Sequence, residues 1–338
     1  MEFFIQILIA AVAMGTPLLF ATLGGVISER AGVINLGMEG LMLVGALVAF
    51  VVMLYTGNYF YAVAAAAFAS GIVSMIHGVV CLMLRASQIA SGLALTFFGT
   101  GLSGLFGDKL MGETVEPLSR IPIPGLHTIP VLGPVLFNQD VIVYFSYLCV
   151  ALSWWLLFKT RIGLNIRSIG EAPEVCDSLG LSVLSYRFFA VVGGGMLIGI
   201  GGAYFPLALT PFWVDGITAG RGWIAVALVI FAFWDPLKAL GGAYLFGLAL
   251  ALELRLQILG IDMSPYFLKM LPYVLTILVL TLVTIRNNRR GIRVMPAALG
   301  KVFFRGEKHW SFVRILPALC RIHPALCRIL KRTDLRFF

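Results

Sequence analysis

The sequence predicts an all-α fold, a polytopic bundle of transmembrane helices. Charged residues make up 12% of the 338 residues, about half of the roughly 25% that a soluble domain carries. Hydrophobic residues make up 60%, and the mean hydropathy is +0.97. Several stretches of about 20 residues have few or no charges, which is the length that crosses a bilayer as a helix. A water-soluble globule is therefore excluded.

About nine stretches qualify as spans, and their boundaries allow eight to ten crossings. The first begins Met1-Glu2-Phe3-Phe4, which lacks a basic n-region. Because its apolar run is also too long for a signal peptide, we predict a retained span. The nine predicted spans are residues 3–27, 36–55, 59–84, 88–107, 139–158, 188–210, 222–234, 237–255 and 267–286.

The seventh stretch predicts an interruption of the bundle. It has about 13 residues, too few to cross about 30 Å as one straight helix. Pro206, Pro211 and the stretch Gly216–Gly222 precede it. We therefore predict a broken or re-entrant element within 206–234. Such a break is tolerated at membrane depth only where protein or a water-filled cavity satisfies the backbone.

The distribution of Lys and Arg predicts the orientation of the chain. With the N-terminus outside, the inner segments carry 20 of the 25 basic residues, which favours N-out and C-in. Residues from Arg286 onward have a net charge of +11, and the rest of the chain has −2. We interpret 1–305 as the transmembrane domain and 306–338 as a basic cytoplasmic tail near anionic membrane lipid. No nucleic-acid-binding surface is predicted.

Two loops are long enough to have a role of their own. The predicted external loop, 108–138, is rich in Pro and suits a compact cap or a simple connection. In the predicted internal loop, 159–187, Pro173 can open a short helix that Gly180 ends. Val175 and Leu179 would share one face of that helix. This pattern favours either a knob that docks on another protein or an ordinary solvated loop helix.

Three motifs in this order resemble one family of membrane proteins. They are Ser28-Glu29-Arg30-Ala31-Gly32-Val33-Ile34-Asn35-Leu36-Gly37-Met38-Glu39-Gly40, the loop Arg161–Gly180, and Gly220-Arg221-Gly222-Trp223-Ile224-Ala225-Val226-Ala227-Leu228. The family comprises permease subunits of ABC importers of the branched-chain amino acid, simple-sugar and nucleoside group. The first motif is most similar to permeases of nucleoside and simple-sugar systems.

The resemblance implies partners, and it implies that this chain is not itself an enzyme. The expected partners are an ATP-binding cassette subunit, a second permease subunit that is homologous or identical, and an extracytoplasmic substrate-binding protein. No phosphate-binding Gly-x-x-x-x-Gly-Lys-Ser/Thr occurs in the sequence, so no cofactor is expected in this chain. ATP and Mg²⁺ would bind to the partner. The residues expected to dock on that partner are Gly170, Glu171, Ala172, Pro173, Glu174, Leu179 and Gly180.

Several polar residues in the spans are candidates for the transport pathway. A stripe of small and polar residues lies within roughly 80° of one helix face and predicts either pathway lining or tight helix packing. Glu39, four residues after Asn35, is an ionisable group in a span and predicts a functional or a structural hydrogen-bonding role. Asp215 and Arg221 flank the interruption, and we predict that they are either an ion-paired gate or two solvated loop charges. The stripe comprises Gln88, Gly92, Thr96, Gly99 and Ser103.

Other chemistries find little support. The five Cys and His77 form no metal-ligand or catalytic pattern, so neither a metal site nor an intramembrane enzyme is predicted. Internal symmetry and carboxylate clusters, which would favour a secondary transporter, are not evident. We expect an importer permease of the bacterial cytoplasmic (inner) membrane for a small polar solute, with nucleosides first and simple sugars second. The tail repeats Pro317–Ile322 as Pro324–Ile329, which predicts either an adventitious extension or a regulatory, lipid-binding tail. For an adventitious extension, truncation after Glu307 is expected to preserve transport.

Overall fold

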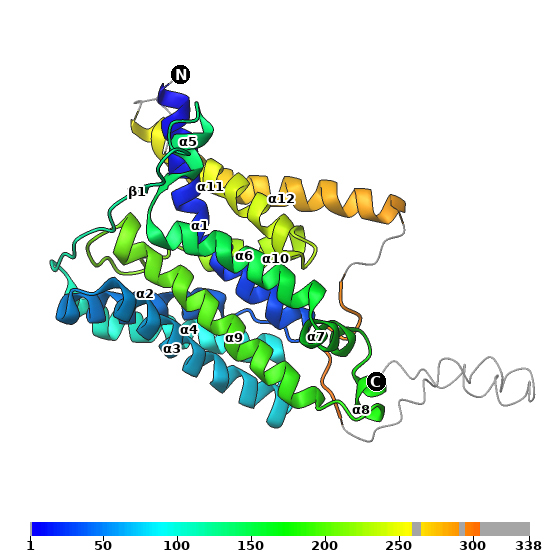
Figure 1. The fold of residues 1–338 in the computed structure, drawn as a ribbon. Coiled ribbons are helices and arrows are strands. Elements are labelled where there is room, and N and C mark those ends of the chain that lie inside the picture. The colour runs from blue at the N-terminus through cyan, green and yellow to red at the C-terminus, as the bar shows by residue number, and fades with distance from the viewer. Residues whose placement is uncertain (1, 259–264, 291–294, 305–338) are drawn as a thin grey trace, which may run out of the picture. The chain divides into compact units, whose positions relative to one another are not determined.

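A computed structural model describes residues 2–258, 265–290 and 295–304 and confirms the predicted all-α bundle (Figure 1). Each of the nine predicted spans coincides with a helix. Seven helical stretches in the described residues are long and apolar enough to cross a membrane. The nine helices are α1 (Glu2–Arg30), α2 (Met38–Thr56), α3 (Tyr59–Gly78), α4 (Gln88–Gly107), α6 (Val141–Lys159), α9 (Val183–Tyr204), α10 (Arg221–Phe231), α11 (Pro236–Ile258) and α12 (Pro265–Arg290).

The remaining elements are short. The α-helices are α5 (Leu132–Leu136), α7 (Arg161–Glu171) and α8 (Pro173–Ser178). Strands β1 (Ile121–Pro122) and β2 (Asn138–Gln139) pair antiparallel, with Ile121 opposite Gln139. One π-helical turn, η1 (Val79–Met83), extends α3, and another, η3 (Phe205–Leu209), extends α9, whereas the 3-10 turn η2 (Asp108–Leu110) follows α4.

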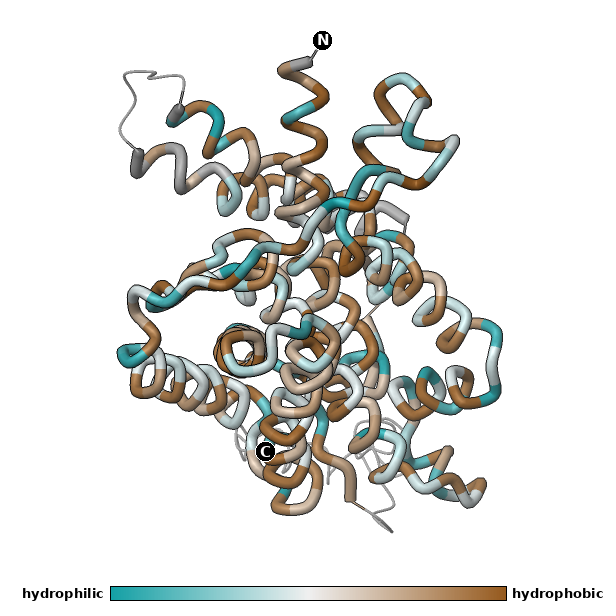
Figure 2. The backbone as a smooth tube through the Cα atoms, turned by 60° about the vertical axis from the view of Figure 1, so that its left-hand side comes forward, coloured by the Kyte–Doolittle hydropathy of each residue, from teal (hydrophilic) through white to brown (hydrophobic). Residues whose placement is uncertain are grey.

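Helix α9 lies at the centre of the bundle. It packs against α1, α2 and α3, while α11 packs on α1, and α4 packs on α2. Glycines permit the close approach of these helices, since a Cβ at Gly199 would collide with the side chain of Ser70 and one at Gly202 with the backbone of Met42. Hydrophobic residues dominate the long helices, whose outer faces are also apolar, as expected for lipid contact (Figure 2).

The chain departs from helical geometry at two places inside the bundle. Residues 31–37, between α1 and α2, are non-helical and mostly buried. After η3, residues 210–220 are also non-helical before α10 begins at Arg221, so the predicted break within 206–234 is confirmed. The loop 108–138 covers this break, because Val115 N donates to Pro211 O and Leu118 N to Leu207 O. Protein contacts therefore satisfy part of the irregular backbone.

The loop 159–187 contains two helices rather than the one short helix that was predicted. Helix α8 begins at Pro173, and Gly180 follows it with a φ of +83°, as the sequence indicated. The additional helix, α7, begins after Thr160, whose hydroxyl accepts a hydrogen bond from Gly163 N. One compact unit comprises Met1–Phe303 and a second comprises Phe304–Phe338. The predicted tail, 306–338, lies outside the described residues.

Candidate functional site

Glu39 joins the two irregular segments of the bundle. Its side chain is buried in the first turn of α2. One carboxylate oxygen accepts hydrogen bonds from Thr218 Oγ1 at 2.5 Å and from Gly220 N at 2.9 Å, and the other accepts from Gly222 N at 2.6 Å. The two glycine amides belong to the N-terminus of α10, where a negative charge is favourable. We call these four residues the Glu39 junction.

The two glycines of the Glu39 junction are required by its geometry. Gly220 has a φ of +78°, a backbone conformation that favours glycine. A Cβ at Gly222 would lie 2.5 Å from Glu39 N, so a larger side chain would separate α10 from α2. The predicted alternatives for Glu39 were a functional and a hydrogen-bonding role. The structure supplies the hydrogen bonds, which link residues about 180 positions apart in the sequence.

The other end of α10 is also attached to the end of α1. Trp234 Nε1 donates to Glu29 Oε2 at 2.6 Å, and the Arg30 guanidinium donates to the carbonyls of Phe233 and Trp234. Phe233 and Trp234 have φ values of 55° and 54°, which are unfavourable for residues with a Cβ. The hydrogen bonds from α1 hold this strained turn. Both ends of α10 are thus fixed to one short segment, residues 29–39.

The polar stripe of α4 faces α2 and the 31–37 segment. Thr96 Oγ1 donates to Leu36 O at 3.1 Å, and Ile34 N donates to Gln88 Oε1 at 2.8 Å. A Cβ at Gly99 would collide with the backbone of Gly40. The structure therefore has the packing arrangement, and a lining role in another conformation stays a prediction. All five members of the stripe, Gln88, Gly92, Thr96, Gly99 and Ser103, are buried.

Three of the candidate pathway residues keep polar atoms without partners. Asn35 Oδ1 accepts from Gly37 N at 3.0 Å, which shapes the turn into α2. In the described part of the chain, Asn35 Nδ2, Gln88 Nε2 and Ser103 Oγ are buried and make no hydrogen bond. Unsatisfied buried groups of this kind are uncommon. These three atoms lie in α4 and in the segment before α2.

The candidate gate residues are not paired with each other. The guanidinium carbon of Arg221 lies 5.2 Å from the centre of the Phe205 ring, in a cation–π arrangement. Asp215 is exposed, and within the described ranges the two side chains form no ion pair. Their role as a gate stays a prediction, whereas Phe205 is the contact of Arg221 that the sequence did not reveal.

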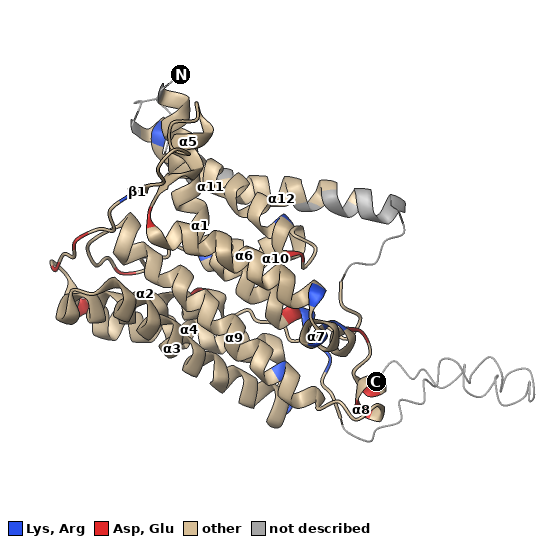
Figure 3. Cartoon of the chain, viewed as in Figure 1, with Lys and Arg blue, Asp and Glu red and all other residues tan. Residues whose placement is uncertain are grey.

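Helices α7 and α8, residues 161–178, lie against the end of α1, and both charge signs gather around them (Figure 3). We call these two helices the coupling element after their predicted role. Gly170 approaches so closely that a Cβ there would collide with Arg30 O. Arg30 and Arg167 both lie over the Phe158 ring, at 5.8 Å and 5.0 Å. Pro173 is buried, Ala172 is half-buried, and Glu171, Glu174, Leu179 and Gly180 are exposed.

The outward face of α8 fits the docking alternative in shape. Val175 is 57% exposed and Leu179 is 76% exposed, although both side chains are apolar. On the inward side, Cys176 is buried and packs with Ile169 of α7 and Val183 of α9. Helix α8 is therefore fixed on one side and presents a small apolar knob on the other.

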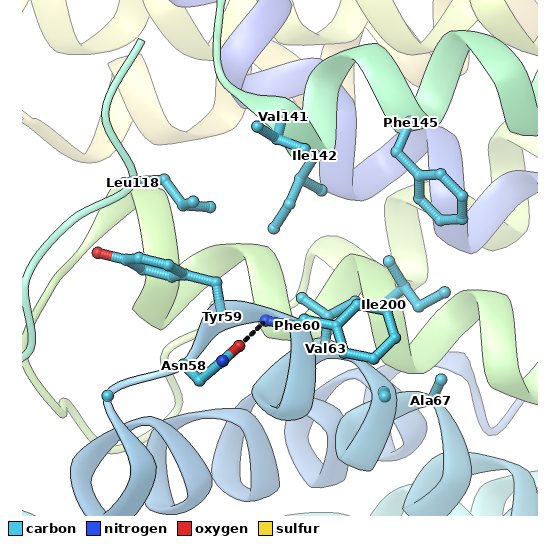
Figure 4. A pocket seen from close by; sticks show the side chains of 12 residues that line it. Asn58, Tyr59, Phe60, Val63, Ala67, Leu118, Val141, Ile142, Phe145 and Ile200 are labelled. Carbon is cyan, nitrogen blue, oxygen red and sulfur yellow. Dashed lines mark hydrogen bonds between the residues drawn. The ribbon is translucent and has the colours of Figure 1, made fainter. Parts of the chain in front are cut away.

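Among the described residues, at least two cavities lie near the loop 108–138. The larger, about 680 Å³, is an apolar space between the beginnings of α3 and α6, with Ile200 of α9 beside it (Figure 4). The smaller, about 200 Å³, is lined in part by Arg120, Asp140 and Tyr204. Tyr204 OH donates to Asp140 Oδ2 at 2.6 Å. No pattern in the sequence indicated this pair, whose members lie 64 positions apart. No metal-binding group of three or more His, Cys, Asp or Glu occurs among the described residues.

Comparison with known proteins places this architecture in a family. Residues 7–280 match the family model described as the permease component of the branched-chain amino acid transport system. The chain belongs to this family. It is an ABC transporter permease, a multi-pass membrane protein and a transporter subunit rather than a catalytic one. The matched range, residues 7–280, contains the residues of the Glu39 junction, of both attachments of α10 and of α7 and α8.

Several curated relatives align over most of their length. The chain is 40% identical to the putative glucose ABC transporter permease protein TsgC13 of Haloferax volcanii, covering 88% of this chain and 97% of that protein. It is 36% identical to the guanosine ABC transporter permease protein NupQ of Bacillus subtilis, covering 88% and 96%. It is 38% identical to the nucleoside ABC transporter permease protein NupC of Lactococcus lactis, covering 82% and 92%. No solved structure matches the chain significantly.

Proposed function

We propose that this permease carries nucleosides into the cytoplasm, driven by a separate ATP-binding cassette subunit that binds ATP and Mg²⁺. Two relatives, NupQ and NupC, are named for guanosine and nucleoside transport, which supports nucleosides. TsgC13 is named for glucose, and simple sugars are therefore the second candidate substrate. A second permease subunit, homologous or identical, and an extracytoplasmic substrate-binding protein complete the importer. The N-terminus lies outside, and the C-terminus lies in the cytoplasm of a bacterial cell.

The observation that carries the proposal is the run of contacts from the coupling element to α10. Gly170 of α7 rests on Arg30 O, and the Arg30 guanidinium holds the Phe233–Trp234 turn at the end of α10. A partner that moves α7 and α8 would therefore displace the turn and α10 together. Because Glu39 holds the opposite end of α10, the displacement would reach the irregular segments 31–37 and 210–220. Alternating access would follow from this movement.

Uptake of labelled guanosine by cells that carry the intact system tests the proposal. Leu179→Asp places a charge on the apolar knob of α8, and we expect uptake to fall to background. Leu84→Asp is the matched control, because Leu84 is 71% exposed and lies outside the coupling element. Membrane abundance of both variants is measured by immunoblot. We expect unlabelled nucleosides to compete and glucose not to compete.

Three results would contradict parts of the proposal. Uptake that survives both Leu179→Asp and removal of the ATP-binding subunit would indicate a secondary transporter. Competition by glucose alone would assign the sugar alternative. Equal losses in Leu179→Asp and Leu84→Asp, at equal abundance, would show that a charge at either site impairs the permease generally and that α8 has no special docking role.

A further inference from the structure

The chain returns to the coupling element after α12. Residues 296–303, which we call the strap, lie beyond the residues that the family model matches. Ala297 N donates to Glu171 Oε2 at 3.2 Å, and Ala298 N donates to Gly170 O at 2.9 Å. Both acceptors belong to the end of α7. The strap therefore contacts the two residues at which the first coupling helix ends.

A second set of hydrogen bonds attaches the strap to the turn after α1. Gly300 N donates to Gly32 O at 3.2 Å. The carbonyl of Ala31 accepts from Arg187 Nε at 3.0 Å, and the carbonyl of Lys301 accepts from Arg187 Nη1 at 3.1 Å. Arg187 of α9 thus bridges the α1 turn and the strap. Gly32 has a φ of +90°, and a Cβ there would lie 2.8 Å from Arg187 Nη2.

Arg187 is an unusual residue to find in this position. Its side chain is fully buried, and no carboxylate lies within ion-pair distance among the described residues. Burying a guanidinium is unfavourable unless hydrogen bonds compensate for lost water. Here backbone carbonyls of two separate segments accept from Nε and Nη1, while Nη2 makes no hydrogen bond within the described residues. The guanidinium therefore connects α1, α9 and the strap, and departure of the strap would remove one of its two hydrogen bonds.

Phe303 adds an apolar contact at the end of the strap. It is 7% exposed and packs in one cluster with Ile169, Cys176 and Val183. These three residues come from α7, α8 and α9 respectively. Removal of Phe303 would expose the inward face of both coupling helices. The strap thus fixes the coupling element by hydrogen bonds at one end and by apolar packing at the other.

We propose that the strap, locked by Arg187 as a positioning residue, holds the coupling element rigidly on the end of α1, so that movement of the coupling element reaches the membrane helices. A loosely attached coupling element would absorb the movement of the partner instead of transmitting it. This inference rests on the proposed function for the source of that movement. It assigns a role to residues 296–303, which follow the residues 7–280 that match the family model.

Two truncations distinguish the effect of losing the strap from the effect of losing the tail. A chain cut after Phe304 keeps the strap and lacks residues 305–338, whereas a chain cut after Met295 lacks both. The point variants Arg187→Gln and Phe303→Ala weaken the strap in the full chain, and Arg187→Lys is the conservative rescue. Arg255→Gln is the control for loss of one guanidinium, because Arg255 lies elsewhere and donates to Gln6. All variants are assembled with the partner subunits in membrane vesicles.

The first readout is alkylation of Cys176 by a maleimide, with every other cysteine replaced by Ser. It reports whether the coupling element is held, and it requires no transport. Because local opening controls access to a buried group, we expect about tenfold faster labelling in Arg187→Gln, Phe303→Ala and the chain cut after Met295. The chain cut after Phe304, Arg255→Gln and the unmodified chain should label slowly. Arg187→Lys should fall between the two groups.

The second readout is the amount of solute taken up per ATP hydrolysed. We expect the ratio to fall in the variants that label quickly, while ATP hydrolysis and membrane abundance persist. Slow labelling in Phe303→Ala, Arg187→Gln and the chain cut after Met295 would overturn the proposal, as would an unchanged ratio in rapidly labelling variants. Absence of ATP-dependent uptake by the unmodified chain would overturn the proposed function, whereas the labelling rates would still decide whether the strap holds the coupling element.

Discussion

At the scale of single residues, a few buried polar side chains fix the backbone of distant segments. Glu39 accepts three hydrogen bonds, two of them from backbone amides of the segment that opens α10. Arg30 and Arg187 donate to backbone carbonyls instead. Where helices are interrupted inside a membrane protein, these side chains satisfy groups that water would otherwise solvate. Their substitution should therefore affect the irregular segments before it affects the helices.

Glu39→Gln should weaken the Glu39 junction. A Gln amide can keep the acceptor that faces Thr218 and Gly220, but its NH₂ group would then face the amide of Gly222. An unsatisfied buried donor costs about 1–3 kcal/mol, so we expect a lower apparent Tm in detergent and reduced uptake. Glu113→Gln, at an exposed position of the loop 108–138, is the matched control. Equal Tm values for the two variants would contradict this role of Glu39.

The thiol of Cys176 should titrate at higher pH than an ordinary cysteine. Burial raises its pKa, and the nearby Glu174 carboxylate adds to the rise. The thiolate is the reactive form, so a raised pKa lowers the reactive fraction at neutral pH and shifts the midpoint of iodoacetamide alkylation upward. Glu174→Gln removes the negative charge and should lower that midpoint towards the ordinary value. A midpoint that is identical with and without Glu174 would be inconsistent with this electrostatic contribution.

At the scale of elements, α10 is notable for its attachment at both ends. The helix has 11 residues, and its N-terminal end and the turn after its C-terminus are bonded to residues 29–39. Short helices gain little stability from their own hydrogen bonds. Helix α10 therefore depends on α1 and α2 for its position, and it should move with them as one body. The Glu29–Trp234 hydrogen bond is the contact that tests this dependence most directly.

Trp234→Phe should destabilise the turn after α10, whereas Glu29→Gln should be tolerated. The Phe ring keeps most of the packing but leaves the buried Glu29 Oε2 without its donor, a loss of about 1–3 kcal/mol. A Gln at position 29 can still accept from Trp234 Nε1. Thermal unfolding and uptake of both variants give the comparison. A larger loss in Glu29→Gln than in Trp234→Phe would show that the carboxylate charge, rather than the hydrogen bond, matters.

Local features of the fold and of the candidate site could be predicted from the sequence, whereas long-range contacts could not. The long apolar runs predicted all nine helical segments, and Pro206 and the glycines after Gly216 predicted the break. The spacing of the α4 stripe predicted a common face, but periodicity does not indicate which element that face contacts. Glu39 was recognised as costly, yet its partners lie about 180 residues away. In the sequence, Arg187 was only one of the basic residues counted for the charge distribution, because its hydrogen-bond partners lie 156 and 114 positions away.

At the scale of the whole molecule, the orientation in the membrane determines whether the coupling element can meet an ATP-binding subunit. Single cysteines in a cysteine-free chain test it, because an impermeant maleimide reaches only the outer face of intact cells. Leu126→Cys lies in the predicted external loop and Leu84→Cys at the predicted inner end of the span 59–84, and both positions are exposed. We expect Leu126→Cys to label in intact cells and Leu84→Cys to label only after permeabilisation.

The orientation experiment also limits the mechanism. Thirteen of the 25 basic residues follow residue 285. Basic residues favour the cytoplasmic side most strongly when they lie near the ends of spans. If Leu84→Cys labelled in intact cells instead, α7 and α8 would be expected outside too, since both loops are predicted on the same side. No cytoplasmic ATPase could then reach Leu179 or the strap. The N-out orientation is therefore a condition that the contacts from Gly170 through Arg30 to α10 must meet before they can transmit the partner's movement.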